Sequence, residues 1–162
     1  AASKRTWKFA KAIAGGGAAF DLGVHMIDTI RYLANSDLEE VRLSKIPAEP
    51  KADEVDLVSS FLLRFKNNVI GRTTASYFGP RITTLEIYGE KGMARAYNWN
   101  SYPQNIKVEQ NINGVQSTQE IFNSNFYMKE IDSFAQSIIE NKPLPVPSTE
   151  GLRNQEIIDL VN

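Results

Sequence analysis

The sequence of 162 residues contains no cysteine and only one histidine. Without cysteine the chain forms no disulfide framework, which is compatible with a reducing compartment. The formal net charge is −1, and no basic cluster points to nucleic-acid binding. No apolar run approaches the length of a membrane span, and no signal peptide is visible. We therefore expect a cytoplasmic protein that binds neither nucleic acid nor membrane.

Hydrophobic residues make up 42% of the sequence and aromatic residues 10%, enough for a sizeable core. No linker or repeat divides the chain, so 1–162 is predicted to be a single domain. The chain begins at Ala1 without methionine and ends within a helical pattern over 154–161. We therefore expect a fragment of a longer protein.

Hydrophobic periodicity and turn signals give the expected order of elements. Helices are predicted over 18–34 and 127–140, with a last helix capped by Ser148 or Thr149. The predicted strands cover 39–46, 55–65, 69–78, 82–88, 93–97, 106–112 and 115–122. This order predicts an α+β fold with a mostly antiparallel open sheet of about six to eight strands and helices packed on one face.

The first predicted helix carries a narrow polar strip. Asp21, His25 and Asp28 are spaced i, i+4 and i+7, which places them on one helical face, and Thr29 and Tyr32 extend it. The rest of the cylinder is largely apolar. We therefore expect a mostly buried helix whose polar strip faces a partner, a cleft or water.

The spacing leaves three interpretations of this strip open. An imidazole one turn from a carboxylate is suited to acid/base chemistry, but such pairs are often structural. Asp21, His25 and Asp28 would also offer three metal ligands, although neither cysteine nor a second histidine completes a typical zinc set. A dinucleotide fingerprint is rejected, because Phe20 stands where the last glycine belongs and no strand precedes Gly15.

The stretch 15–28, GGGAAFDLGVHMID, resembles the G-G-G-x-x-x-D-x-G-x-H-x-x-D signature of the glucose–fructose oxidoreductase/inositol dehydrogenase (Gfo/Idh/MocA) family. Trp7-Lys8 resembles the W-[RK] that often precedes that signature. Further matches lie at 85–92, 134–143 and 149–152, with Ser137 and Asn141 departing from the usual Ala and Gly.

The resemblance implies a C-terminal domain, with a dihydrodipicolinate reductase-like sheet, from an NAD(P)-dependent oxidoreductase of sugars, polyols or inositol-like compounds. By position His25 inherits the acid/base role, and Asp21 positions the histidine and the substrate. A lysine from an E-K-P motif in an N-terminal Rossmann domain completes the set in the family. This chain contains neither E-K-P nor G-x-G-x-x-G. We therefore expect NAD or NADP to be bound mainly by an absent domain, and the fragment alone to be inactive.

Three further residues are candidate substrate contacts: Asp28, Lys8 and Trp99. Trp99 lies in an aromatic group with Tyr97 and Tyr102, which suits either a sugar site or hairpin packing. Gly16 and Gly17 are candidate cofactor contacts through their backbone N–H groups. No metal is expected.

One face of the predicted sheet is mixed in polarity and includes Val58, Ser60, Leu62, Thr74 and Ser76. In the resembling family such an open face commonly mediates assembly, so we expect a homodimer or homotetramer; an ordinary half-wet sheet face is the alternative. The alternative function is a non-catalytic sugar-binding or oligomerisation module of the same fold.

Overall fold

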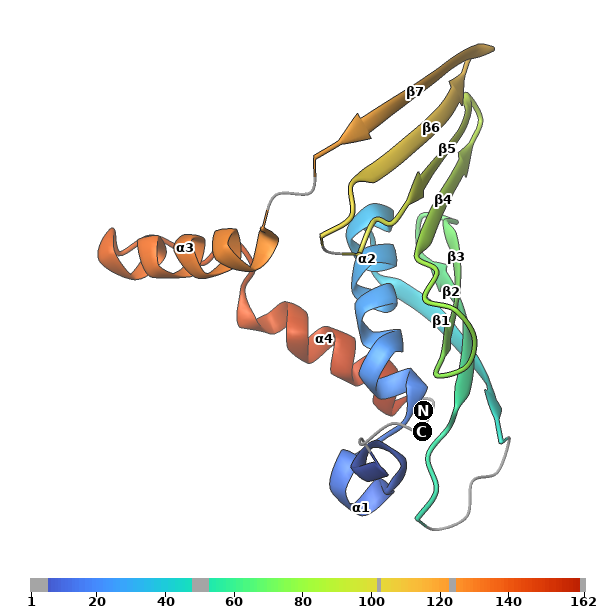
Figure 1. Ribbon diagram of the computed structural model, residues 1–162, viewed down its shortest axis with the longest axis vertical. Coiled ribbons are helices and arrows are strands. Elements are labelled where there is room, and N and C mark those ends of the chain that lie inside the picture. Colours follow the sequence, from blue (N-terminus) through green and yellow to red (C-terminus); the bar gives the residue numbers. More distant parts are fainter. Residues whose placement is uncertain (1–5, 48–52, 102, 123–124, 161–162) are drawn as a thin grey trace. The chain divides into compact units, whose positions relative to one another are not determined.

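The computed structural model describes residues 6–47, 53–101, 103–122 and 125–160. Contacts within the chain divide it into two compact units, which are described separately below. The first unit is formed by Ala1–Gly79 together with Val146–Asn162, and the second by Pro80–Pro145. Figure 1 shows the helices and strands of the two units, coloured along the sequence.

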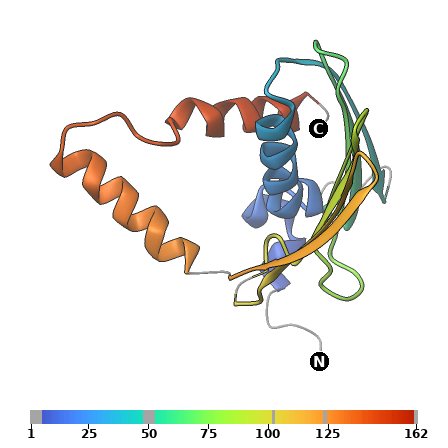
Figure 2. The ribbon, with the colours of Figure 1, turned by 90° about the horizontal axis from the view of Figure 1, so that it is seen from above.

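The first unit contains a three-stranded antiparallel sheet in the order β1-β2-β3. Its strands are β1 (Leu38–Ile46), β2 (Val58–Phe65) and β3 (Ile70–Ser76). Its helices are a 3₁₀ turn η1 (Thr6–Phe9), α1 (Lys11–Ala14), a π-helical turn η2 (Ala19–Gly23), α2 (Val24–Ala34) and α4 (Ser148–Asp159). Helix α2 lies along one face of this sheet with α4 beside it (Figures 1 and 2).

The core of the first unit is formed where η2–α2, β2 and α4 meet. Its buried residues are Ala19, Ile27, Ala34, Phe61, Leu63, Phe65, Ile157 and Ile158. Along η2 and α2, Ala19, Gly23, Ile27 and Ala34 are buried and share one side of the helix. Burying each large side chain of this set contributes on the order of 1.5–3 kcal/mol to the free energy of unfolding.

Small residues let the helix approach the sheet closely. A Cβ added to Gly71 in β3 would lie 2.3 Å from Cγ2 of Ile30, and one added to Gly23 would lie 2.9 Å from Cε2 of Phe61. Gly71 pairs with Leu63 across the sheet, so Ile30 rests on the backbone beside a fully buried leucine. Any larger residue at Gly71 would separate α2 from the sheet.

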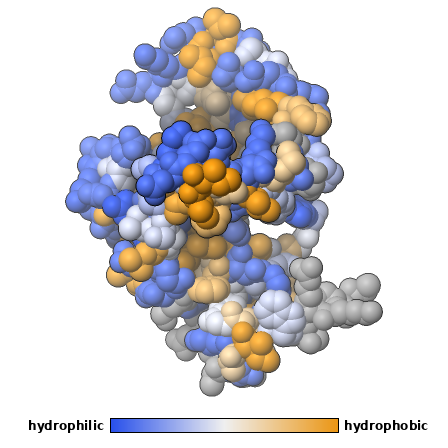
Figure 3. Space-filling view, turned by 90° about the vertical axis from the view of Figure 1, so that its left-hand side faces the viewer, coloured by the Kyte–Doolittle hydropathy of each residue, from blue (hydrophilic) through white to orange (hydrophobic). Residues whose placement is uncertain are grey.

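The second unit contains a four-stranded antiparallel sheet in the order β4-β5-β6-β7 and a helix. Its elements are β4 (Thr84–Gly89), β5 (Gly92–Tyr97), β6 (Ile106–Ile112), β7 (Val115–Ile121) and α3 (Phe126–Ile139). Asn113 and Gly114 turn β6 into β7 with φ angles of 52° and 81°, as the Asn-Gly pair predicts. Helix α3 exposes several apolar side chains, among them Ile131 at 68%. Residues coloured as hydrophobic are visible in several places on the surface drawn in Figure 3.

The predicted α+β fold class is confirmed. The described residues form seven strands, all paired antiparallel, and α2 and α4 cover one face of the three-stranded sheet. In these residues no helix is long and apolar enough to cross a membrane.

Two local expectations were wrong. Helix α4 is preceded by Pro147 at its N-cap without a side-chain cap, so Ser148 is its first helical residue. The helix over 18–34 is not mostly buried, because Tyr32 is 83% exposed and Leu33 is 44% exposed. The reason is that α2 buries a narrow stripe against the sheet, while its opposite side carries the polar strip.

Candidate functional site

Asp21 and His25 lie at the junction between the π-helical turn η2 and helix α2. The buried stripe of this helix contains Gly23 and Ile27, and the strip of Asp21 and His25 lies on the opposite side. Asp21 is half-buried, with 35% of its side chain exposed, and His25 is exposed. The sequence pattern therefore predicted correctly that these two residues share a face.

The carboxylate of Asp21 is held by two residues from distant parts of the first unit. Lys8 Nζ, in η1, lies 2.5 Å from Asp21 Oδ2. The hydroxyl of Tyr77, just after β3, donates a hydrogen bond to the same oxygen at 3.2 Å. The structure thus brings Lys8, predicted as a substrate contact, to the predicted positioning aspartate.

Tyr77 was missed from the sequence. Its pKa is raised above the ordinary value, first by burial of the phenol and then by the negative charge and hydrogen bond of Asp21, with a smaller effect of Asp56. Tyr77 therefore remains a protonated hydrogen-bond donor to Asp21. No local pattern identifies it, because it is separated from Asp21 by 56 residues.

The imidazole of His25 is not part of this contact network. Among the described residues no hydrogen bond or ion pair joins it to Asp21 or to another side chain. Thr29 Oγ1 donates to the backbone carbonyl of His25 at 3.0 Å and does not bind the ring. A structural Asp–His pair is therefore not formed. The ring nitrogens face no competing partner from the described part of the chain and are available for a ligand.

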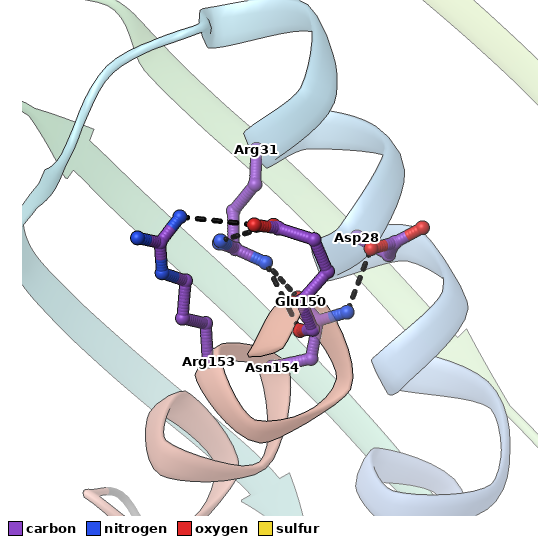
Figure 4. Close-up of polar contacts among 5 residues, drawn as sticks. All are labelled: Asp28, Arg31, Glu150, Arg153 and Asn154. Atoms are coloured by element: carbon purple, nitrogen blue, oxygen red, sulfur yellow. Dashed lines mark hydrogen bonds and ion pairs between the residues drawn. The ribbon is translucent and has the colours of Figure 1, made fainter. Parts of the chain in front are cut away.

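Asp28 belongs to a different cluster, which joins α2 to α4 (Figure 4). Asn154 Nδ2 donates to Asp28 Oδ1 at 2.7 Å, and Arg31 Nη1 donates to Asn154 Oδ1 at 2.5 Å. Arg31 Nη2 also pairs with Glu150 Oε2 at 2.9 Å. These bonds give Asp28 a contact that fastens two helices, and its role as a substrate contact stays a prediction.

The structure does not gather the three residues of the metal interpretation into one ligand set. Asp21 is bound to a lysine ammonium, Asp28 to an asparagine amide, and the His25 ring to neither carboxylate. Within the described ranges, no group of three or more His, Cys, Asp or Glu side chains is placed to hold a metal ion.

The glycine stretch is bound by a buried carboxylate that the sequence analysis did not single out. Asp56 is 6% exposed. Its Oδ1 accepts from Gly17 N at 3.2 Å, and its Oδ2 accepts from Ala19 N at 2.7 Å and Ser59 Oγ at 2.5 Å. Its backbone carbonyl also accepts from Ala18 N at 2.8 Å. In the sequence, Ser59 indicates a polar contact here, because it is a polar residue on the apolar face of the predicted strand 55–65.

Gly17 is required by this contact, because a Cβ there would lie 2.0 Å from the Asp56 carbonyl oxygen. The N–H of Gly17 donates to Asp56 and is therefore engaged within the protein. A cofactor contact at Gly17 stays a prediction. A hollow of about 260 Å³ adjoins the stretch and is lined by Gly15, Gly16, Gly17, Lys11, Phe20 and Lys45 among other residues. Neither Asp21 nor His25 lines it.

Trp99 lies in the second unit, in the turn after β5, and is half-buried. Its neighbour in sequence, Tyr97, donates its hydroxyl proton to Glu109 Oε2 at 3.0 Å and accepts from Arg95 Nη1 at 3.2 Å. Tyr97 is thus engaged within its own sheet, and Tyr102 lies outside the described residues. The sugar-site interpretation of this aromatic group stays a prediction.

The chain resembles known oxidoreductases both in sequence and in fold. Residues 1–95 match the family described as the GFO/IDH/MocA C-terminal domain. The levoglucosan dehydrogenase of Pseudarthrobacter phenanthrenivorans is 31% identical over 114 residues, which cover 56% of this chain and 29% of that protein.

Solved structures show the same fold. The aldose–aldose oxidoreductase from Caulobacter crescentus, complexed with glycerol, superposes with a TM-score of 0.84 at 20% identity, over 99% of this chain and 48% of that one. KijD10, a 3-ketoreductase from Actinomadura kijaniata in complex with NADP, gives 0.81 at 18% identity, over 98% and 49%. The chain therefore spans less than a third of the dehydrogenase and about half of each solved chain.

Proposed function

Since the chain belongs to the GFO/IDH/MocA C-terminal domain family, we propose that it is the substrate domain of an NAD(P)-dependent oxidoreductase acting on a sugar, polyol or inositol-like alcohol. The observation that supports this most directly is the imidazole of His25, which has no side-chain partner among the described residues and lies one helical turn from the fixed carboxylate of Asp21. The names of the related proteins, a levoglucosan dehydrogenase and an aldose–aldose oxidoreductase among them, agree with a carbohydrate-like substrate.

The residues of this chain would handle the proton of the reaction. In the oxidative direction the imidazole of His25 accepts the proton of the substrate hydroxyl, and in the reductive direction the imidazolium returns it. Asp21 would position the substrate by accepting a hydrogen bond from another of its hydroxyl groups, since the proton of the reacting hydroxyl goes to His25. The nicotinamide, when bound, supplies the hydride acceptor or donor.

NAD or NADP would be held mainly by a Rossmann domain outside the chain, because 1–162 contains no G-x-G-x-x-G fingerprint. In this proposal 1–162 is one substrate-binding and assembly domain that is inactive alone. Gly16 lines the hollow, and we propose its backbone as the better candidate for a cofactor contact. The N–H of the other candidate, Gly17, donates to Asp56.

A cytoplasmic location and a homodimer or homotetramer stay predictions. The outer face of the three-stranded sheet supports assembly, because Ser60, Leu62 and Thr74 share it and Leu62 is 47% exposed. Sedimentation velocity of the purified protein tests the assembly, and a monomer at micromolar concentration would contradict it.

The proposed reaction is tested on the protein expressed from its complete natural reading frame. Nicotinamide absorbance is followed with NAD or NADP and a panel of sugars and polyols. With a substrate identified, we expect His25→Ala to lower kcat by about 10²–10⁴-fold, since one acid/base group contributes that much. The thermal unfolding midpoint should barely change, because the side chain is exposed. An unchanged kcat would remove His25 from the reaction, and a wild-type protein inactive on the whole panel would favour a non-catalytic module.

A further inference from the structure

The contacts of Asp21 are unevenly distributed between its two oxygens. Lys8 Nζ and Tyr77 Oη both bind Oδ2, at 2.5 and 3.2 Å. No residue in the described part of the chain forms a hydrogen bond with Oδ1. A carboxylate has acceptor sites on both oxygens, so one oxygen is fixed and the other retains its full acceptor capacity.

The two residues that bind Oδ2 are themselves held in place. The rings of Phe9 and Tyr77 pack edge to face, with centroids 5.7 Å apart and an interplanar angle of 83°. The backbone N–H of Tyr77 donates to the carbonyl of Leu57 at 2.9 Å. Lys8 Nζ lies 5.8 Å from the Trp7 ring centroid and 6.0 Å from that of Tyr77. The turn η1 and the end of β3 therefore form one packed support for the carboxylate.

Stability alone does not account for this arrangement. The Lys8 and Asp21 side chains are 23% and 35% exposed, and partly exposed ion pairs contribute little to the free energy of unfolding. The arrangement does fix one carboxylate rotamer with a cation and a neutral donor. Such fixed orientation is what an acceptor that positions a substrate hydroxyl requires.

We infer that Lys8 and Tyr77 are positioning residues, which clamp Asp21 through Oδ2 so that Oδ1 accepts a hydrogen bond from a substrate hydroxyl. This inference rests on the proposed oxidoreductase function and adds two residues to it. Lys8 is then part of the protein's support for the site and not a direct substrate contact.

The test is a double-mutant cycle in the protein from the complete natural reading frame, with a substrate that the wild type turns over. Lys8→Met and Tyr77→Phe should each lower kcat by about 10–10²-fold, because a mispositioned acceptor loses orientation. KM should change less than kcat. In an Asp21→Asn background, the same substitutions should change kcat by less than about twofold, since they act only through Asp21. Lys8→Arg keeps the cation and should restore most of the rate.

Matched controls come from pairs of the same chemistry elsewhere. Lys66 binds Asp37 at 3.0 Å with both side chains exposed, and Tyr88 donates to Glu86 at 2.9 Å. Lys66→Met and Tyr88→Phe should leave kcat unchanged. If Lys8→Met does not fold, Lys8→Gln takes its place in the cycle.

The outcomes separate this inference from the function on which it rests. A wild-type protein without turnover overturns the proposed function, and the positioning role with it. In a second outcome the wild type is active, and the Lys8 and Tyr77 variants lose as much rate in the Asp21→Asn background as they do with Asp21 intact. This would show that the two residues act directly on the substrate, and it would overturn the clamp alone. Unchanged kcat in both single variants also overturns it.

Discussion

Two carboxylates in the first unit, Asp21 and Asp56, lie close to the same helix start but are used differently. Asp56 is 6% exposed and accepts from two backbone amides and a serine hydroxyl through both oxygens. Asp21 is more exposed and is held by Lys8 and Tyr77 through one oxygen only.

The difference separates a structural carboxylate from a functional one. Asp56 meets neutral donors from the protein itself, which fasten the glycine stretch and the first turn of η2 to the strand β2. Its acceptor capacity is spent inside the fold. Asp21 has an oxygen without a partner among the described residues, as a group that binds an external hydroxyl must have.

The largest expected difference is in stability. Asp56→Asn replaces an acceptor by an NH₂ group that faces a backbone N–H or the Ser59 hydroxyl, so we expect a loss of about 3 kcal/mol in the free energy of unfolding. Asp21→Asn should lose no more than about 1 kcal/mol, because its ion pair is partly exposed. Urea unfolding of both variants measures the contrast, and equal losses would contradict the assignment of the two roles.

A smaller effect is expected from the glycine that faces Asp56. In Gly17→Ala the added Cβ would start 2.0 Å from the Asp56 carbonyl oxygen, so the backbone must move, at a cost of about 2 kcal/mol. Gly151→Ala is the matched control, because a Cβ at that helical glycine meets nothing within 4 Å. The control should be neutral or stabilising by up to about 1 kcal/mol. Equal urea midpoints for the two variants would show that the Asp56 contact is looser than described.

Local pattern predicted most of the fold. The strand 106–112, the Asn113-Gly114 turn and the shared face of Asp21 and His25 all follow from spacing and turn chemistry. The same reasoning predicted the last helix but named Ser148 or Thr149 as its cap, whereas Pro147 is the N-cap residue and the helix begins at Ser148.

The contacts of the site were less accessible to sequence reasoning, because they join segments far apart in the chain. Asp56 binds amides 37 and 39 residues away, and Tyr77 binds a carboxylate 56 residues away. Every residue except proline has a backbone N–H, so the sequence does not indicate which of these groups a carboxylate binds. Lys8 was recognised as a candidate, but its partner depends on how η1 folds back over the sheet end, which hydrophobic periodicity does not encode.

The smallest expected effect is on the stability of the protein at alkaline pH, and it concerns Tyr77, which binds Asp21. Burial and the negative charge of Asp21 raise the pKa of Tyr77 above its ordinary value. As the pH rises through about 10, the unfolded chain therefore releases this proton before the folded chain does, and the free energy of unfolding falls. Below that pH the contribution is fully present.

Tyr77→Phe removes this titration, so its free energy of unfolding should fall less steeply than that of the wild type between about pH 8 and about pH 11. Urea unfolding across this range measures both slopes. Parallel curves for Tyr77→Phe and the wild type would mean that the phenol does not hold its proton against Asp21, and the clamp on Oδ2 would then rest on Lys8 alone.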